Sequence, residues 1–181
     1  MGIPLVEKIY PNSQIALMIN DRLHQIEENL NILREQQASL EKEALLTTGL
    51  PKTQAEQRLR LEIKPKIRDY EQEYWQILAE NANQLDIPEP KAEVIVAEIV
   101  ESVGRLEVQQ NYSAEIMQIL VELRDKLNQP KTPAAIKVKW ALSGIPPFVS
   151  LAAEGELDVE KFLQINFPTF RNWSKVLAKK L

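Results

Sequence analysis

The chain contains no cysteine, one histidine and five glycines among 181 residues. Without cysteine it can form neither a disulfide nor a thiolate metal site, and it has no cysteine nucleophile. One histidine, His24, cannot supply the two Glu-x-x-His units of a carboxylate-bridged di-iron bundle. The few glycines form no Walker lysine loop and no Gly-x-Gly-x-x-Gly turn. We therefore predict that the chain is not an enzyme, with no catalytic, cofactor-binding or metal-binding residues and no cofactor.

Long apolar runs are also missing. No stretch is long enough to cross a bilayer, and the first residues lack the cationic and then apolar pattern of a signal segment. Hydrophobic residues make up 44% of the chain and charged residues 27%, with a net charge of -4. This composition is sufficient for a hydrophobic core. We expect a cytoplasmic protein.

The first half of the chain has the spacing of a coiled coil. Apolar residues separated by alternating steps of three and four occur on both sides of a turn at residues 47–52, and only Gln37 interrupts them. The first arm contains Ala16, Ile19, Leu23, Ile26, Leu30, Leu33, Gln37, Leu40 and Ala44, and the second contains Leu59, Ile63, Ile67, Tyr70, Tyr74 and Ile77. Pro65 should kink the second arm. We predict a long antiparallel helical hairpin over residues 1–87.

The second half begins after two prolines in residues 86–90, which favour a break. Broad apolar faces predict helices over 91–109 and from Ser113, its N-cap, to about 128, so residues 88–129 should complete a bundle. In residues 130–181, large apolar residues two apart on either side of Gly144–Pro147 predict a small β-hairpin. Short helices should follow Asp158 and Pro168. The predicted fold class is mainly α, with that β-hairpin near the C-terminus.

Charged residues give no clear site. Acidic pairs such as Glu71 and Glu73 are expected to face solvent, as is the basic surface of residues 136–181, which has seven basic against four acidic residues. A basic stretch from Arg58 to Arg68 is interrupted by Glu62, and the whole chain is acidic, with a pI near 5.3. A nucleic-acid footprint concentrates positive charge on one face. The sequence therefore argues against nucleic-acid binding.

Two parts of the chain resemble known modules. Leu30–Arg34, Glu43–Thr48 and Arg58–Glu62 are similar to a coiled-coil module of cyanobacterial multidomain signalling and conflict proteins. A C-terminal segment of the same proteins resembles Lys137–Lys139, Ile145–Ser150, Glu156–Asp158 and Phe167–Phe170. In those proteins such modules accompany TIR, caspase-like or NACHT-type NTPase domains and act in coupling or assembly. The resemblance implies no catalytic residues, and this chain has neither an effector nor a nucleotide-binding domain.

The leading functional hypothesis is a non-enzymatic interaction, adaptor or assembly protein in bacterial signalling or defence. Its partner would be another protein or a second copy of the chain, because a lone β-hairpin needs something to pair with or to pack against. The candidate interaction residues are Val138, Trp140, Leu142, Phe148 and Trp173.

Two alternatives stay open. The first is a membrane-acting helical effector that uses the C-terminal hairpin and basic helix, which the sequence allows but does not favour, because Lys137 and Lys139 make the hairpin a poor membrane span. The second is a fragment of a larger regulator.

Overall fold

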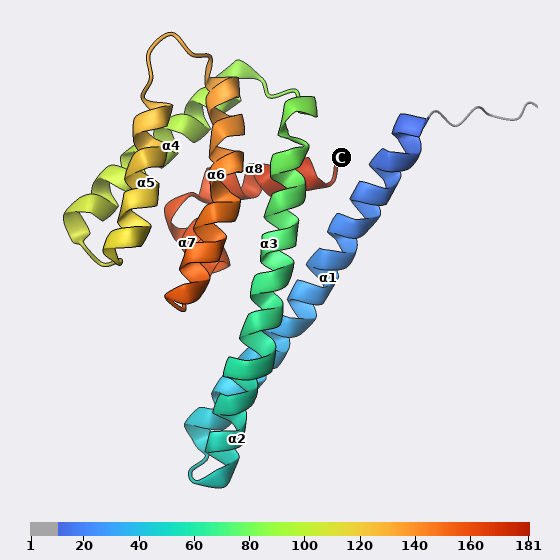
Figure 1. Cartoon of the computed structure of the whole chain (residues 1–181), viewed down its shortest axis with the longest axis vertical. Helices are drawn as coiled ribbons and strands as arrows, with labels where there is room; N and C mark the ends of the chain where they lie inside the picture. The colour runs from blue at the N-terminus through green and yellow to red at the C-terminus, as the bar shows by residue number, and fades with distance from the viewer. Residues whose placement is uncertain (1–10) are drawn as a thin grey trace, which may run out of the picture.

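A computed structural model describes residues 11–181, and this part of the chain folds almost entirely into helices (Figure 1). The α-helices are α1 (Pro11–Leu46), α2 (Leu50–Arg58), α3 (Lys64–Glu80), α4 (Glu89–Gln109), α5 (Ala114–Leu127), α6 (Ala134–Glu154), α7 (Val159–Asn166) and α8 (Pro168–Ala178). A π-helical segment, η1 (Leu59–Ile63), and a short 3-10 segment, η2 (Ala82–Gln84), flank α3. The prediction of a mainly α fold is confirmed.

The helical hairpin consists of α1 and the returning arm α2–η1–α3 (Figure 1). Ion pairs from Arg22 to Glu73 and from Arg34 to Glu71 join the two arms. The seam that the heptad pattern predicted is the buried face of α1, on which Leu23, Ile26 and Leu30 are at most 4% exposed. Gln37 does not cross the seam, because its side-chain amide donates to Glu41 on the same helix, 2.8 Å away.

The second arm bends where proline was expected to disturb it. Pro65 is the second residue of α3, and the π segment η1 ends two residues before it. Proline has no N–H to offer the carbonyl four residues earlier. In a π turn the hydrogen-bond partner lies five residues along instead of four, so the helix can pass the proline without ending. The arm therefore continues as one unit past Pro65.

The predicted β-hairpin is wrong: residues 11–181 contain no strand, and the segment that should have formed it is the helix α6. Its apolar residues fit two periods at once. The helical period is the one that is used, since residues three or four apart form one buried stripe, each at most 2% exposed. This stripe contains Val138, Ala141, Leu142, Ile145, Val149 and Ala152.

Pro146 and Pro147, expected to form a turn, lie inside α6. A proline in a helix interior costs about 3 kcal/mol, whereas burial of each large apolar side chain stabilises by about 1.5–3 kcal/mol. The α6 helix contacts α3, α4 and α5, so it is buried from several sides. Burial of the whole stripe therefore outweighs two lost backbone hydrogen bonds.

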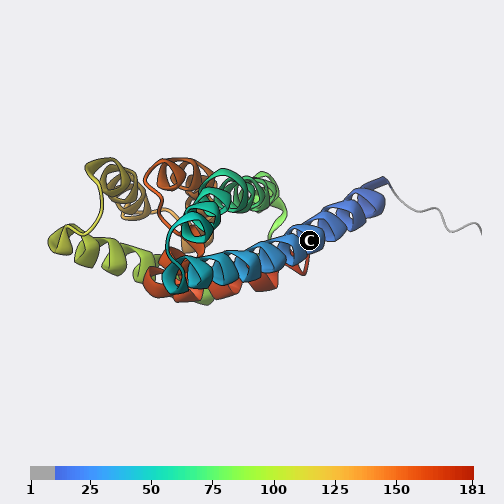
Figure 2. The same cartoon turned by 90° about the horizontal axis from the view of Figure 1, so that it is seen from below.

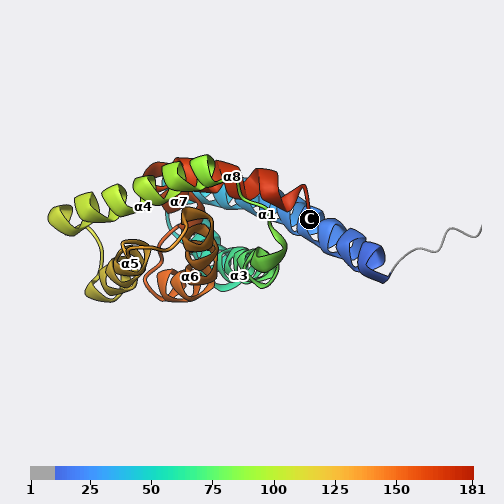
Figure 3. The same cartoon turned by 90° about the horizontal axis from the view of Figure 1, so that it is seen from above.

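The helices form two layers that are visible along the long axis. The α3, α6 and α5 helices lie side by side in one layer, and α1, α8 and α4 form the other (Figures 2 and 3). One hydrophobic cluster fills the space between them and includes residues from every α-helix except α2. The distal end of the hairpin has a smaller cluster of its own, formed by Leu33, Leu40, Ala55, Leu59 and Ile63. We call residues 33–63 the distal hairpin.

Two carboxylates of α4 cap the helices of the C-terminal third. Glu89 accepts hydrogen bonds from the backbone N–H groups of Ala134 and Ala135, at 2.5 and 3.1 Å, where α6 begins. Glu98 accepts from Thr169 and Phe170, both at 3.0 Å, where α8 begins. A carboxylate at a helix N-terminus satisfies unpaired N–H groups and complements the helix dipole. The α4 helix therefore positions both α6 and α8.

The all-helical structure predicts that Leu142→Ala destabilises the protein by about 2–5 kcal/mol, because it leaves a cavity at the centre of the bundle. Its neighbour Ser143 is exposed, so Ser143→Ala should change stability by no more than about 0.5 kcal/mol. Urea unfolding followed by circular dichroism measures both. Equal stability of the two variants would contradict the placement of Leu142 in the core.

Candidate functional site

The five candidate interaction residues lie in or against the interior of the bundle. Val138, Leu142 and Phe148 are at most 2% exposed, and Trp173 is 8% exposed. Trp140 is half-buried, with the Lys126 ammonium 5.1 Å from its ring centroid. Four of the five are therefore part of the hydrophobic core, and the five residues form neither a sheet edge nor an exposed surface.

The polar residues that the structure does bring together form a buried ion-pair network between the hairpin and the C-terminal helices. Glu160 of α7 lies at its centre, with an oxygen 2.8 Å from Nε of Arg171 and another 3.5 Å from Nζ of Lys175. Arg34 of α1 lies 4.0 Å from Glu160 and donates to Glu71 of α3 at 2.9 Å. Four helices, α1, α3, α7 and α8, thus share one set of charges.

Arg171 is the most enclosed cation of this network, at 6% exposed. Its guanidinium lies 5.4 Å from the ring centroid of Tyr74 and 5.2 Å from that of Trp75, and it donates to Ser174 Oγ at 3.2 Å. Trp75 also stacks on Phe170, at 6.0 Å between centroids. Aromatic faces attract a cation, most strongly where water is excluded. Arg171 therefore links α8 to α3 by charge and by ring contact together.

The two buried carboxyls of the network respond to it in opposite directions. Burial raises the pKa of Glu71 to about 7, and the single cation Arg34 only partly opposes this effect. Burial also acts to raise the pKa of Glu160, but Arg171, Arg34 and Lys175 outweigh it, so that pKa lies below its usual value. Glu71 has one cation and two nearby carboxylates, whereas Glu160 has three cations and a hydrogen bond from Gln164, and this explains the difference.

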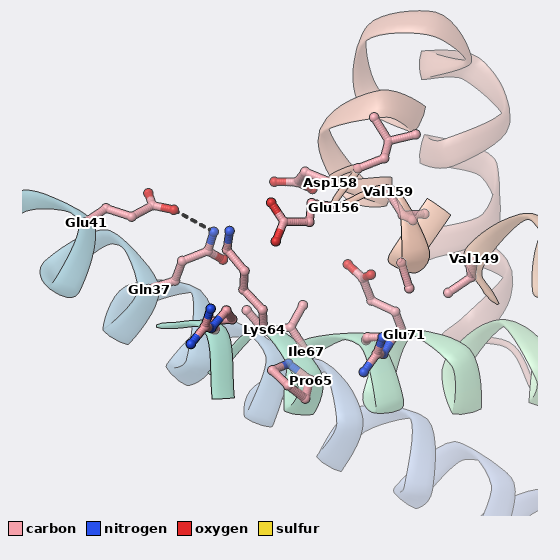
Figure 4. A pocket seen from close by; sticks show the side chains of 14 residues that line it. Gln37, Glu41, Lys64, Pro65, Ile67, Glu71, Val149, Glu156, Asp158 and Val159 are labelled. Atoms are coloured by element: carbon pink, nitrogen blue, oxygen red, sulfur yellow. Dashed lines mark hydrogen bonds between the residues drawn. The ribbon is translucent and has the colours of Figure 1, made fainter. Parts of the chain in front are cut away.

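A cleft lies beside the network, between the second arm of the hairpin and the turn that joins α6 to α7 (Figure 4). Its volume is about 350 Å³. Lys64 and Glu71 enter it from α3, while Glu156 and Asp158 enter it from the turn (Figure 4). That turn is held by hydrogen bonds from the N–H groups of Glu156 and Leu157 to carbonyls of α6, at 3.3 and 2.9 Å. Apolar side chains, including Ile67 and Val149, complete the lining.

The distal hairpin is the second surface that stands out. It extends beyond α7 (Figure 1). Exposed leucines lie at and near its turn. Leu45, Leu46, Leu50 and Leu61 are between 65% and 85% exposed. The two arms of the distal hairpin differ little in charge: residues 33–46 have three acidic and two basic residues, and residues 50–63 have three basic and two acidic.

Sequence reasoning missed the network, because it placed Glu71 and the basic C-terminal surface in solvent. Glu71 is 7% exposed. A signal was present: Glu71 lies four residues after Ile67 and four before Trp75, within an apolar stripe. On α8 the small residues Ser174 and Ala178 follow Arg171 on the same face and leave room for the guanidinium.

Comparison with known proteins yields no relative. No family model matches the chain, and neither curated protein sequences nor solved structures give a match. Within residues 11–181, no helix combines the length and apolarity that a membrane crossing requires. The same residues contain no group of three or more histidine or acidic side chains that could hold a metal ion.

The network predicts that Arg171→Ala destabilises the protein by about 3–5 kcal/mol, because it leaves the buried Glu160 without its nearest cation. The matched control is Arg58→Ala, which removes an exposed pair with Glu62 and should cost less than about 1 kcal/mol. Thermal unfolding of both variants at pH 7 measures the difference. Equal losses would show that Arg171 is not held as described.

The raised pKa of Glu71 predicts how stability changes with pH. Between about pH 4.5 and 7 the folded chain keeps a proton on Glu71 that the unfolded chain has lost, so this group lowers stability as pH rises through that range. Glu71→Gln removes the titration. Melting temperatures from pH 5 to 8 should therefore decline less with rising pH in the variant than in the wild type, and parallel profiles would contradict the prediction.

Proposed function

We propose that this chain is a non-enzymatic assembly module that associates with a second copy of itself through the distal hairpin. The observation that carries the proposal is the exposure of four leucines at the end of a rod only two helices thick. Large apolar side chains that are exposed at one end of a molecule are typical of a surface that another protein covers. The bundle and its ion-pair network serve as the rigid base from which this surface extends.

The self-complementary shape of the distal hairpin argues for a second copy as the occupant. Its first arm has one excess negative charge and its second arm one excess positive charge, so the two arms do not repel each other. When two copies meet about a two-fold axis, the first arm of each lies against the second arm of its partner, because the same patch is used on both sides. Two helical hairpins joined in this way form a four-helix bundle with the leucines at its centre. An unrelated partner would need to match both the charge pattern and the apolar patch.

The setting that we propose is bacterial signalling or defence, in the cytoplasm, on the strength of the resemblance to cyanobacterial coupling modules. The membrane-acting alternative has no supporting observation among the described residues. Two of the three aromatic side chains that would suit a membrane interface, Phe148 and Trp173, lie in the core. Nucleic acid is not part of the proposal, because acidic residues interrupt the basic stretch.

Light scattering behind a sizing column tests the proposal across a concentration series. The wild type should change from the 20.8 kDa monomer to a dimer as concentration rises. The double variant Leu45→Glu with Leu50→Glu should stay monomeric, because it places charge in the apolar patch.

The matched control is Val94→Glu with Val108→Glu, which changes two exposed valines of α4, 57% and 84% exposed, away from the distal hairpin. It should dimerise as the wild type does. A wild type that is monomeric at every concentration, or a distal variant that dimerises as well as the control, would refute the proposal.

A further inference from the structure

The cleft beside the ion-pair network has the size and composition of a small-molecule site. A volume of about 350 Å³ lies within the range of ligand pockets. Its partly exposed apolar lining comes from Ile67, Ala153 and Leu157, and charged groups of both signs surround it. Ligand sites combine an apolar surface with a few polar groups that orient the ligand.

Glu71 presents a free acceptor to the cleft. The residue is 7% exposed, and only its Oε1 accepts a hydrogen bond, from Arg34 at 2.9 Å. Within residues 11–181, no buried side-chain oxygen lacks a hydrogen-bond partner, so the unpaired Oε2 of Glu71 must be accessible from the cleft that this residue lines. A largely buried carboxylate with one oxygen open to a cavity is a ready partner for a cation.

Arg68 supplies the opposite charge one helical turn away. It lines the cleft, is exposed, and forms no ion pair with any described residue. Arg68 and Glu71 are three residues apart on α3, so their Cβ atoms lie about 5–6 Å from each other on one face. The Arg68 guanidinium has no ion-pair partner among the described residues, and the Glu71 carboxylate has one oxygen without a hydrogen bond. At this separation the two groups can bind a molecule that carries a carboxylate and an ammonium on the same carbon.

We propose that the cleft binds a small zwitterion of the α-amino acid class with an apolar side chain. Its carboxylate pairs with the Arg68 guanidinium, and its ammonium pairs with Oε2 of Glu71. Its side chain packs against the partly exposed apolar residues Ile67, Ala153 and Leu157. Asp158 and Glu156 lie on the opposite wall and add negative charge near the ammonium. The inference does not depend on the proposed self-association.

Binding should depend on pH through Glu71. The charged groups that act on its carboxyl are Arg34 from α1, Asp158 from the turn before α7, and Glu160 from α7. Burial, the largest effect, raises the pKa of Glu71 to about 7. Only the ionised carboxylate attracts an ammonium, so affinity should be several-fold lower at pH 6 than at pH 8.

Isothermal titration of the full chain at pH 8 tests the proposal with three probes that share one branched side chain. L-leucine has both charges, 3-methylbutylamine has only the ammonium, and 4-methylpentanoate has only the carboxylate. L-leucine should bind, and each of the other two should bind at least about tenfold more weakly, because each loses one charge-assisted pair. No saturable binding of L-leucine up to about 10 mM, or equal binding of 3-methylbutylamine, would overturn the proposal.

Two variants test the assigned residues. Arg68→Met and Glu71→Gln should each weaken L-leucine binding at least about tenfold. The control Lys66→Met changes an exposed lysine of the same helix that does not line the cleft, and it should bind as the wild type does. Arg68 is exposed, so its variant keeps the test valid even if Glu71→Gln folds poorly. Equal effects of Arg68→Met and Lys66→Met would refute the assignment.

The two proposals fail separately. The distal double variant Leu45→Glu with Leu50→Glu leaves the cleft residues unchanged, so it should still bind L-leucine. Light scattering of Arg68→Met, with and without L-leucine, reports whether assembly is unaffected by the loss of binding.

Discussion

The structure depends on the burial of one guanidinium. Arg171 is enclosed by the rings of Tyr74 and Trp75, and its charge is matched by Glu160. A buried charge is tolerated only while its partners stay in place, since its removal from water is expensive. Glu160 is held in turn by cations from α1 and α8, and Arg34 extends the contact to Glu71. The relative positions of hairpin and C-terminal helices are thus set together, because displacing any one helix leaves a charge unmatched.

This arrangement divides the hairpin into two parts with different support. The proximal part packs into the main hydrophobic cluster and carries the ion pairs to the C-terminal helices. The distal hairpin has only a narrow cluster between two helices. A small core gives little stability of its own, so opening of the chain should begin at the distal end. The surface proposed for assembly therefore lies on the part of the hairpin with the smaller core, and the larger hydrophobic cluster supports the rest.

The sequence predicted the features that depend on a repeating pattern or on neighbouring residues, namely the buried face of α1 and the starts of two helices. The heptad spacing located the seam of α1, and single residues located helix starts: the Ser113 hydroxyl accepts from Ile116 N–H at 3.3 Å, and Asp158 accepts from Lys161 N–H at 3.0 Å. Prediction from the sequence failed where the local structure depends on contacts between residues far apart in the chain. The apolar residues of α6 fit strand and helix periods alike, and only packing against α3, α4 and α5 decides between them. The spacing around Glu71 and Arg171 places both on apolar faces, but their ion-pair partners could not be predicted, because these partners lie on other helices.

The π segment at Leu59–Ile63 determines which way the two ends of the second arm face. Ala55, Leu59, Ile63 and Ile67 follow one another in steps of four, and in a regular α-helix each such step overshoots a full turn by about 40°. A wider turn absorbs part of this overshoot. The buried residues Ala55, Leu59 and Ile63 at the distal end and Tyr74 at the proximal end can then all face α1. The π segment thus keeps the buried faces of the two halves of the arm in line, so its length matters more than the identity of its residues.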